Sequence, residues 1–219
     1  PNNPTGAVYS REEVLKIASL AKKYHVSLIV DELYSRQVFD GREYTHLCAQ
    51  KEIPEEMVTI IGPSKTESLS GYRLGAAFGS EEVITRMEKL QAIVSLRAAG
   101  YCQAVFRCWF NEPEDFMEDR ILAHQKIRDD LVEKFKSVPG MQVRPTEAGS
   151  YLFPQLPPMD VPIGDFTKIL RQLAGVTVTP GTEFGPGFTD SFRINFSQDH
   201  EKALAAADRL IQVVERYRK

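Results

Sequence analysis

One lysine, set on a turn between two short apolar segments, constrains this chain more than any other feature. The apolar run 57–61 predicts a strand that leads into the turn, and a second apolar segment, 74–78, leaves it. Lys65 lies in the turn, with Ser64 before it and Arg73 further along. A lysine held in such a turn can be desolvated and lose its proton, and a neutral amine is a nucleophile that forms Schiff bases with aldehydes.

The neighbours of this lysine are suited to bind a phosphate group. Ser64 carries a hydroxyl, and Arg73 can hold a phosphate through a bidentate, charge-assisted fork. An aldehyde that carries a phosphate is a description of pyridoxal 5′-phosphate (PLP), which is therefore the predicted cofactor. A Ser-Lys pair alone would be weak evidence, because most surface lysines are only solvated, so the prediction depends on contacts from other segments.

A carboxylate and a phenol follow a second predicted strand. The mostly apolar run 26–30 is typical of a parallel strand buried on both faces, and it leads into Asp31 and Tyr34. Side chains at the carboxyl end of such a strand lie where open α/β sheets bind ligands. Asp31 could pair with a protonated ring nitrogen, whereas Tyr34 and Asn3 could donate to the phenolate oxygen of the cofactor. The alternatives are a helix N-cap for Asp31, a packed aromatic for Tyr34 and turn chemistry for Asn3.

Together these motifs resemble the class I/II aminotransferases, PLP enzymes of the aspartate aminotransferase fold (fold type I). The resemblance runs along nearly the whole chain, and the motifs that carry it are Asn3-Pro4-Thr5-Gly6, Asp31-x-x-Tyr34, Ser64-Lys65, Arg73-x-Gly75 and Phe192-Arg193-Ile194-Asn195-Phe196.

The resemblance implies a role for each matching residue. Lys65 would be the Schiff-base lysine and Asp31 the partner of the ring nitrogen, and both would be catalytic. The residues implied to bind the cofactor are Asn3, Asp31, Tyr34, Ser64, Lys65 and Arg73. Arg193 would bind the α-carboxylate of the amino-acid substrate, a task that suits a planar guanidinium on a strand. The alternative for Arg193 is a surface arginine on an edge strand.

The implied fold class is α/β, in two domains. Residues 1–138 would form the C-terminal part of the PLP-binding large domain, a mixed or parallel sheet with helices. Residues 139–219 would form a small C-terminal α+β domain. Helical periodicity predicts helices over 11–24, 81–110, 113–137, 163–173 and 199–217, and apolar runs predict small-domain strands over 141–144, 150–153, 176–179 and 191–196.

Composition excludes several other classes of function. The net charge of −3 and the lack of any lysine- or arginine-rich run argue against a nucleic-acid partner. No apolar stretch approaches the ~18 residues of a transmembrane helix, so no membrane partner is expected. The scattered histidines lack the spacing of a metal site. The odd set Cys48, Cys102 and Cys108 is typical of reduced thiols, which predicts a cytoplasmic protein.

The resemblance also implies partners. Family members carry a long segment ahead of the position of Pro1, with early strands of the large-domain sheet and a phosphate-binding loop. We therefore expect a missing N-terminal segment of the same enzyme as a companion, since without it strand edges would be exposed. Because the family is mostly dimeric, a homodimer is expected as well.

Three functions fit these residues. Transamination is the commonest activity of the family. The run from Gly62 to Arg73 also resembles a subgroup that oxidises or hydroxylates L-arginine with PLP and O2 on the way to antibiotic amino acids such as enduracididine. There Glu67 would bind the substrate guanidinium, although it could equally face solvent or cap a turn. The third possibility is a PLP-binding regulatory domain that acts as a sensor.

Overall fold

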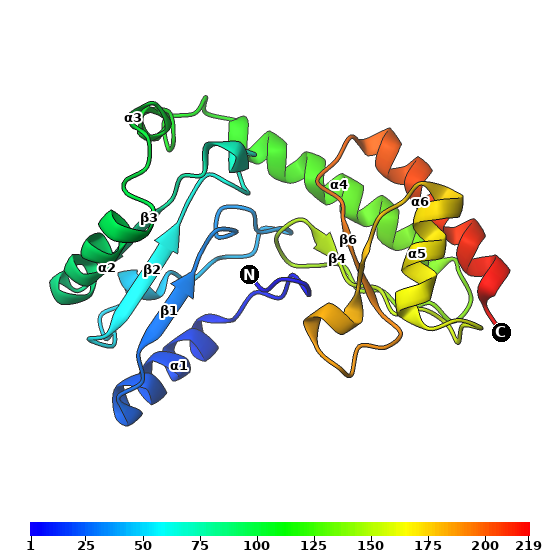
Figure 1. Ribbon diagram of the computed structural model, residues 1–219, viewed down its shortest axis with the longest axis horizontal. Coiled ribbons are helices and arrows are strands. Elements are labelled where there is room, and N and C mark those ends of the chain that lie inside the picture. Colours follow the sequence, from blue (N-terminus) through cyan, green and yellow to red (C-terminus); the bar gives the residue numbers. More distant parts are fainter. The chain divides into compact units, whose positions relative to one another are not determined.

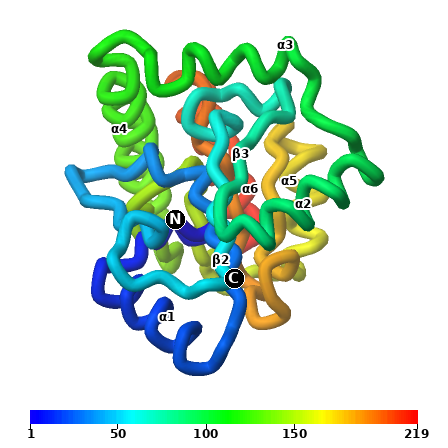
Figure 2. Tube along the Cα trace, turned by 90° about the vertical axis from the view of Figure 1, so that its left-hand side faces the viewer, coloured from blue at the N-terminus to red at the C-terminus, as the bar shows by residue number.

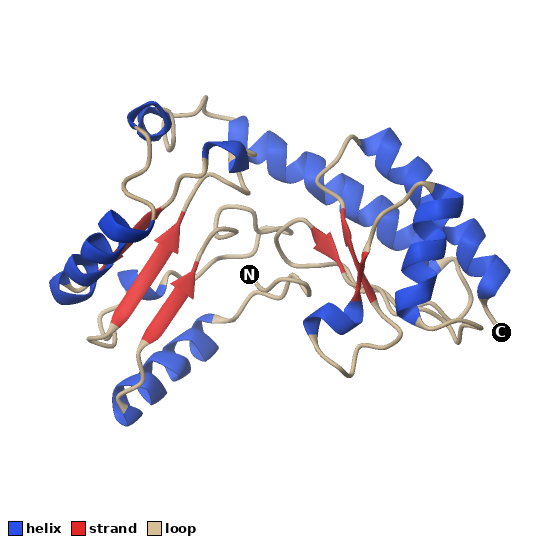
Figure 3. Cartoon of the chain, in the orientation of Figure 1, coloured by secondary structure: helices blue, strands red, loops and turns tan.

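The computed structural model describes residues 1–219 as two compact units. The first unit comprises Pro1 and Val8–Met117, and the second comprises Asn2–Ala7 and Glu118–Lys219. Each unit contains its own three-stranded sheet and its own helices, which Figure 3 distinguishes by colour. The domain boundary expected after residue 138 stays a prediction. The long helix that precedes this position falls almost wholly within the second unit.

The first unit is built on a mixed sheet. Its strands are β1 (Leu28–Asp31), β2 (Met57–Ile61) and β3 (Ala76–Gly79), arranged in the order β1-β2-β3. β1 pairs with β2 in parallel, and β2 pairs with β3 antiparallel (Figure 1). A Cβ atom on Gly79 would lie 2.3 Å from the Met57 carbonyl oxygen, so only glycine fits at the end of β3. The expected mixed α/β sheet is confirmed.

Helix α1 (Arg11–Tyr24) precedes the sheet, and Figure 2 traces the chain from it, in blue, into β1. Ser10 and Glu13 form a reciprocal capping box at its start, which stabilises the first backbone N–H groups. Ala18 of this helix packs against Leu47 and Met57 in a small apolar core. The helix confirms the bounds expected from its periodicity.

The chain after the sheet departs from the expected continuous helix. Helix α2 (Glu81–Val94) ends early, and the short α3 (Gly100–Gln103) and η3 (Ala104–Arg107) follow it. The prediction of one helix over 81–110 is therefore wrong. Leu96 adopts a φ of 58°, in the left-handed region, and an α-helix cannot continue through that conformation. Two further short turns of 3-10 helix in this unit are η1 (Leu47–Ala49) and η2 (Ser70–Tyr72).

The second unit combines three long helices with a small antiparallel sheet. The helices are α4 (Phe116–Lys136), α5 (Ile163–Ala174) and α6 (His200–Tyr217), and the strands are β4 (Tyr151–Leu152), β5 (Thr179–Pro180) and β6 (Phe192–Asn195) in the order β4-β6-β5, with η4 (Gly181–Phe184) after β5. The fully buried side chains of Phe135, Phe166, Phe192 and Leu210 form its core. The strand expected over 141–144 is absent from the described residues, where Gln142 makes only an isolated bridge to Gln155.

The segment Asn2–Ala7 belongs to the second unit through a close backbone contact. Gly6 has a φ of 67°, and its carbonyl oxygen accepts hydrogen bonds from the backbone N–H groups of Glu147 and Ala148, both at 3.1 Å. A Cβ atom on Gly6 would lie 2.5 Å from the Cβ atom of Thr146, so a side chain cannot fit there. This contact fixes Asn3, a predicted cofactor ligand. Among the helices of residues 1–219, none combines the length and apolarity needed to cross a membrane.

Candidate active site

Asp31 and Lys65 lie at the carboxyl ends of two neighbouring parallel strands, Asp31 as the last residue of one and Lys65 in the turn after the other. Asp31 is the last residue of β1 and lies opposite Ile60 in the β1–β2 register. β2 ends one residue later, and a tight turn then delivers Lys65. A Cβ atom on Gly62 would lie 3.1 Å from both the Leu33 side chain and a backbone oxygen, so the turn is closely packed. This edge of the sheet is where open α/β sheets bind ligands.

The two groups predicted to be catalytic are both accessible. Lys65 is exposed, and no side chain among the described residues pairs with its amine. Asp31 is also exposed, and its Oδ1 atom accepts a hydrogen bond from the backbone N–H of Leu33 at 3.1 Å. The residues after Asp31 form turns, so the alternative of a helix N-cap does not apply. Its second oxygen is left to accept a proton donor.

The loop between β2 and β3 carries the residues predicted to bind phosphate. Ser64 is half-buried next to Lys65, and Arg73 is exposed at the end of η2. Arg73 donates one hydrogen bond from Nη1 to the Ser70 carbonyl oxygen at 2.9 Å, which leaves most of its guanidinium available. It also lines a cavity of ≈ 550 Å³ together with Ser68 and Tyr101. Tyr34 is half-buried three residues beyond Asp31, in the turns that follow β1.

A buried carboxylate, that of Glu32, comes directly after Asp31 and the end of β1. The Glu32 side chain is almost fully buried, and its Oε2 atom is 2.5 Å from Nδ1 of His46. Burial raises the pKa of the Tyr44 phenol far above its ordinary value, and the charges of Glu32 and Asp31 add to this effect. Burial, followed by the charge of Glu32, also raises the pKa of the Cys48 thiol. This negative region favours protonated, uncharged neighbours.

Arg193 and Asn3 meet in the second unit. Arg193 lies on β6, and its Nη1 donates to Oδ1 of Asn3 at 2.8 Å while its Nη2 donates to Oγ1 of Thr179 at 3.3 Å. The guanidinium carbon lies 4.3 Å from the ring centroid of Tyr151 and 4.9 Å from that of Phe184. Because arginine only donates, the amide oxygen of Asn3 is fixed and its NH2 group remains a donor for another ligand.

Sequence reasoning found Asn3 and Arg193 separately but not their partners. Thr179, Tyr151 and Phe184 hold the guanidinium by contacts between segments that are distant in the sequence, and no motif marks them. A half-buried arginine held between two aromatic rings is not the exposed surface residue of the alternative interpretation.

The expected partner of Glu67 is a substrate guanidinium, whereas the structure shows a guanidinium from the same chain, that of Arg36. Its carboxylate is almost fully buried and accepts a hydrogen bond from Nη1 of Arg36 at 2.6 Å. Arg36 also binds Glu112, and neither residue is found from the sequence. Arg36 lies in the stretch 35–56 that reads as irregular, and Glu112 lies between two expected helices. A role for Glu67 in binding substrate stays a prediction.

Known proteins similar to this chain agree on one family. The model of the family "Aminotransferase class I and II" matches residues 1–210. An aspartate aminotransferase of Musicola paradisiaca is 29% identical over 99% of this chain and 54% of its own length, and one of Pyrococcus horikoshii is 29% identical over 98% of this chain and 55% of its own length. The chain thus spans about half the length of the curated relatives it matches.

Solved structures agree with the sequence relatives. The crystal structure of an aspartate aminotransferase from Rhodobacter sphaeroides is 60% identical with a TM-score of 0.96, and the match covers 100% of this chain and 56% of that one. An aspartate aminotransferase from Rhizobium meliloti gives a TM-score of 0.88 at 28% identity and covers 99% of this chain and 57% of that one. The expected type I fold is confirmed, and the chain belongs to the aminotransferase class I and II family.

Proposed function

We propose that this chain is part of a PLP-dependent aminotransferase that moves an amino group between an amino acid and a 2-oxo acid. The observation that carries the proposal is the placement of an accessible lysine and an accessible aspartate at the carboxyl ends of two adjacent parallel strands. Membership of a PLP-dependent family supports the same reading. Because relatives of this chain are named aspartate aminotransferases, a dicarboxylic amino acid is the first substrate to test.

The residues of the chain fit the cofactor chemically. When bound, PLP supplies an aldehyde that reacts with amines and a conjugated ring that accepts negative charge from Cα. Lys65 provides the amine that holds the aldehyde and, once released, a base for the Cα proton. Asp31 has one carboxylate oxygen to spare for holding a proton on the ring nitrogen. Ser64 and the mostly unused guanidinium of Arg73 suit the phosphate.

The remaining contacts concern the phenolate oxygen and the substrate. Tyr34 and the NH2 group of Asn3 are the proposed donors to the phenolate oxygen. Arg193 is the proposed partner of the substrate α-carboxylate. Its two internal hydrogen bonds leave three of the five N–H donors of a guanidinium, enough for a bidentate fork.

The active enzyme is proposed to include a companion segment of the same protein and to form a homodimer. Apolar side chains on β1 and α2 support the companion, because Ile29 is 77% exposed and Ile93 is 82% exposed. Unpaired strand edges and exposed apolar faces of this kind usually have a partner. The greater length of the relatives agrees. Three free cysteines support the cytoplasm as the location.

Neither alternative function is favoured by the relatives. The L-arginine oxidase or hydroxylase reading assigned Glu67 to a substrate guanidinium, but Arg36 already binds that carboxylate. The sensor reading requires cofactor binding without turnover. Both alternatives predict that Lys65 holds PLP, so the absorption spectrum of the bound cofactor does not distinguish them from transamination. The reaction product does.

Labelling of Lys65 tests the proposal directly. The complete enzyme, with its companion segment, is incubated with PLP and reduced with borohydride, and the labelled peptide is identified by mass spectrometry. We expect the label on Lys65 and loss of both label and visible absorption in Lys65→Ala. Lys22→Ala, which removes an exposed lysine of α1, is the matched control and is expected to keep both.

Turnover decides between the three functions. With PLP bound, an aminotransferase converts aspartate and 2-oxoglutarate to the corresponding oxo acid and amino acid without consuming oxygen. Oxygen uptake with L-arginine would instead establish the oxidase reading, and cofactor binding without any turnover would establish the sensor. A label on another lysine, or an unchanged spectrum in Lys65→Ala, would remove the basis of all three.

A further inference from the structure

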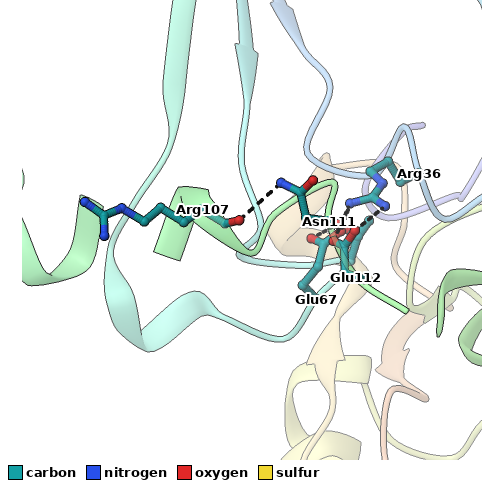
Figure 4. Close-up of polar contacts among 6 residues, drawn as sticks. Arg36, Glu67, Arg107, Asn111 and Glu112 are labelled. Atoms are coloured by element: carbon teal, nitrogen blue, oxygen red, sulfur yellow. Dashed lines mark hydrogen bonds and ion pairs between the residues drawn. The ribbon is translucent and has the colours of Figure 1, made fainter. Parts of the chain in front are cut away.

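A single guanidinium links three segments of the first unit. Nη1 of Arg36 donates to Oε1 of Glu67 at 2.6 Å and to Oε1 of Glu112 at 2.9 Å, and its Nη2 donates to Oε2 of Glu112 at 3.3 Å. Figure 4 shows the two carboxylates converging on the guanidinium. The guanidinium carbon also lies 4.5 Å from the ring centroid of Phe110. We call Arg36, Glu67 and Glu112 the guanidinium clamp.

The clamp is largely shielded from water. The exposed fraction of the side chain is 22% for Arg36, 4% for Glu67 and 14% for Glu112. Both oxygens of Glu67 are occupied, since Oε1 accepts from Arg36 and Oε2 accepts from the Thr66 hydroxyl. The hydrogen bonds from Arg36 hold the pKa of Glu112 below its ordinary value. Breaking a buried pair by removing one partner leaves an uncompensated charge, which destabilises a protein strongly.

The guanidinium clamp lies just beyond the carboxyl ends of β1 and β2. The β1–β2 ladder ends at the pair Asp31 and Ile60, followed by one hydrogen bond from the Glu32 N–H to the Ile60 carbonyl oxygen at 2.9 Å. Beyond this point both chains leave the sheet as turns. Arg36 lies in the turns that follow Asp31 and carry Tyr34. Its partner Glu67 lies two residues after Lys65, so their hydrogen bond joins these turns to the lysine turn.

We infer that Arg36 is a positioning residue for Lys65, acting through Glu67. The inference rests on the proposed PLP-dependent function. Arg36 fixes the turn that presents the lysine amine relative to the segment that presents Asp31, and Glu112 fixes Arg36 in turn. Phe110 and the polar contact between Asn111 and the Arg107 carbonyl oxygen, at 3.1 Å and also drawn in Figure 4, order the segment that carries Glu112.

Arg36→Met in the PLP-loaded complete enzyme tests the inference. Visible circular dichroism of the bound cofactor reports the geometry of its attachment, and steady-state kinetics separate kcat from KM. We expect a reduced or inverted dichroic band and a kcat lower by about 10- to 100-fold, because small displacements of a reacting group have effects of that size. KM for the amino acid should change much less, since Arg193 and not Arg36 is the proposed carboxylate ligand.

Two further variants keep the result interpretable. Arg209→Met is the matched control, because Arg209 of α6 bonds the carbonyl oxygens of Ala174 and Ala205 and has no part in the site. It should lower Tm and leave the dichroic band and kcat unchanged. Arg36→Met leaves two carboxylates unpaired, and the double variant Arg36→Met with Glu67→Gln removes the charge of Glu67, the more deeply buried of the two, whose burial opposes folding of the single variant. It should fold with the altered band and low kcat retained.

The outcomes separate this inference from the proposed function. A wild-type enzyme without a visible PLP band would refute the function itself. If the wild type shows the PLP band and Arg36→Met changes neither this band nor kcat, Arg36 only stabilises the fold. Recovery of the wild-type band and kcat in the double variant would show that Arg36 merely neutralises Glu67, and positioning would be refuted.

Discussion

Substitution of Arg193 by lysine should weaken substrate binding without removing the positive charge. Arg193 uses two of its N–H donors internally, on Asn3 and Thr179, and its guanidinium lies between the rings of Tyr151 and Phe184. These contacts hold the guanidinium in place and leave three N–H donors for the proposed carboxylate contact. A lysine ammonium is a point charge that cannot form a planar fork, so it can replace only part of this contact.

The magnitude follows from the number of hydrogen bonds lost. A hydrogen bond to a charged group contributes about 1.5–3 kcal/mol, and Arg193→Lys removes one of the two bonds of the fork. KM for the amino acid should therefore rise by about 10- to 100-fold, since every ~1.4 kcal/mol is a factor of ten. Arg193→Met removes both bonds and the charge and should raise KM further. Asn3 loses its partner in both variants, so PLP affinity should fall by a smaller factor.

The assay compares KM for the amino acid with the dissociation constant of PLP in the complete enzyme. Arg144→Lys, an exposed arginine of the same unit, is the control and should leave both values unchanged. The reasoning would be refuted by equal losses of substrate and cofactor affinity in Arg193→Lys, because Arg193 would then support the fold around Asn3 and not the substrate.

Two predictions concern the second unit. Burial lowers the pKa of His124 from its ordinary value of 6.5 and outweighs the opposing effect of its hydrogen bond with the backbone of Arg120. The folded state therefore binds fewer protons than the unfolded state, and stability should fall as pH drops below 6.5. Denaturant titrations above and below this pH measure the loss of stability. If the free energy of unfolding falls with pH as steeply in His124→Gln as in the wild type, the loss belongs to other groups. Phe135→Ala should cost about 3–5 kcal/mol, because its fully buried ring meets Phe192 edge-on at 6.3 Å between ring centroids and a cavity would remain. A loss of less than about 1 kcal/mol in a chemical denaturation experiment would mean that the core collapses around the cavity.

Local patterns predicted the part of the site that depends on strand ends. An apolar run followed by a polar residue marks both β1 with Asp31 and the β2 turn with Lys65, because each strand and the residue it delivers are adjacent in the sequence. The guanidinium clamp is different. Arg36 lies 31 positions from Glu67 and 76 from Glu112, and pairings over such separations leave no local periodicity.

The end of α2 also could not be predicted from local sequence patterns. The periodicity up to Val94 correctly predicts a helix. The following residues, Arg97, Ala98 and Ala99, include strong helix formers, so propensity favours continuation to 110. Leu96 nevertheless takes a left-handed conformation, which costs energy for a residue with a side chain and persists only where the surrounding structure compensates. Helix propensity does not report such a single left-handed residue, so it could not predict where the helix ends.

Arg36 and Arg193 differ in how many donors remain, and this difference separates the positioning role proposed for Arg36 from the binding role proposed for Arg193. Arg36 donates two hydrogen bonds from Nη1 and one from Nη2 to two largely buried carboxylates, so its charge is already compensated. Arg193 donates its two internal hydrogen bonds to neutral oxygens. No acidic side chain among the described residues pairs with its charge. An anionic substrate gains full electrostatic attraction only from the second arrangement. The two residues have the same chemistry, but their hydrogen-bond partners support a positioning role for Arg36 and agree with the proposed substrate-binding role of Arg193.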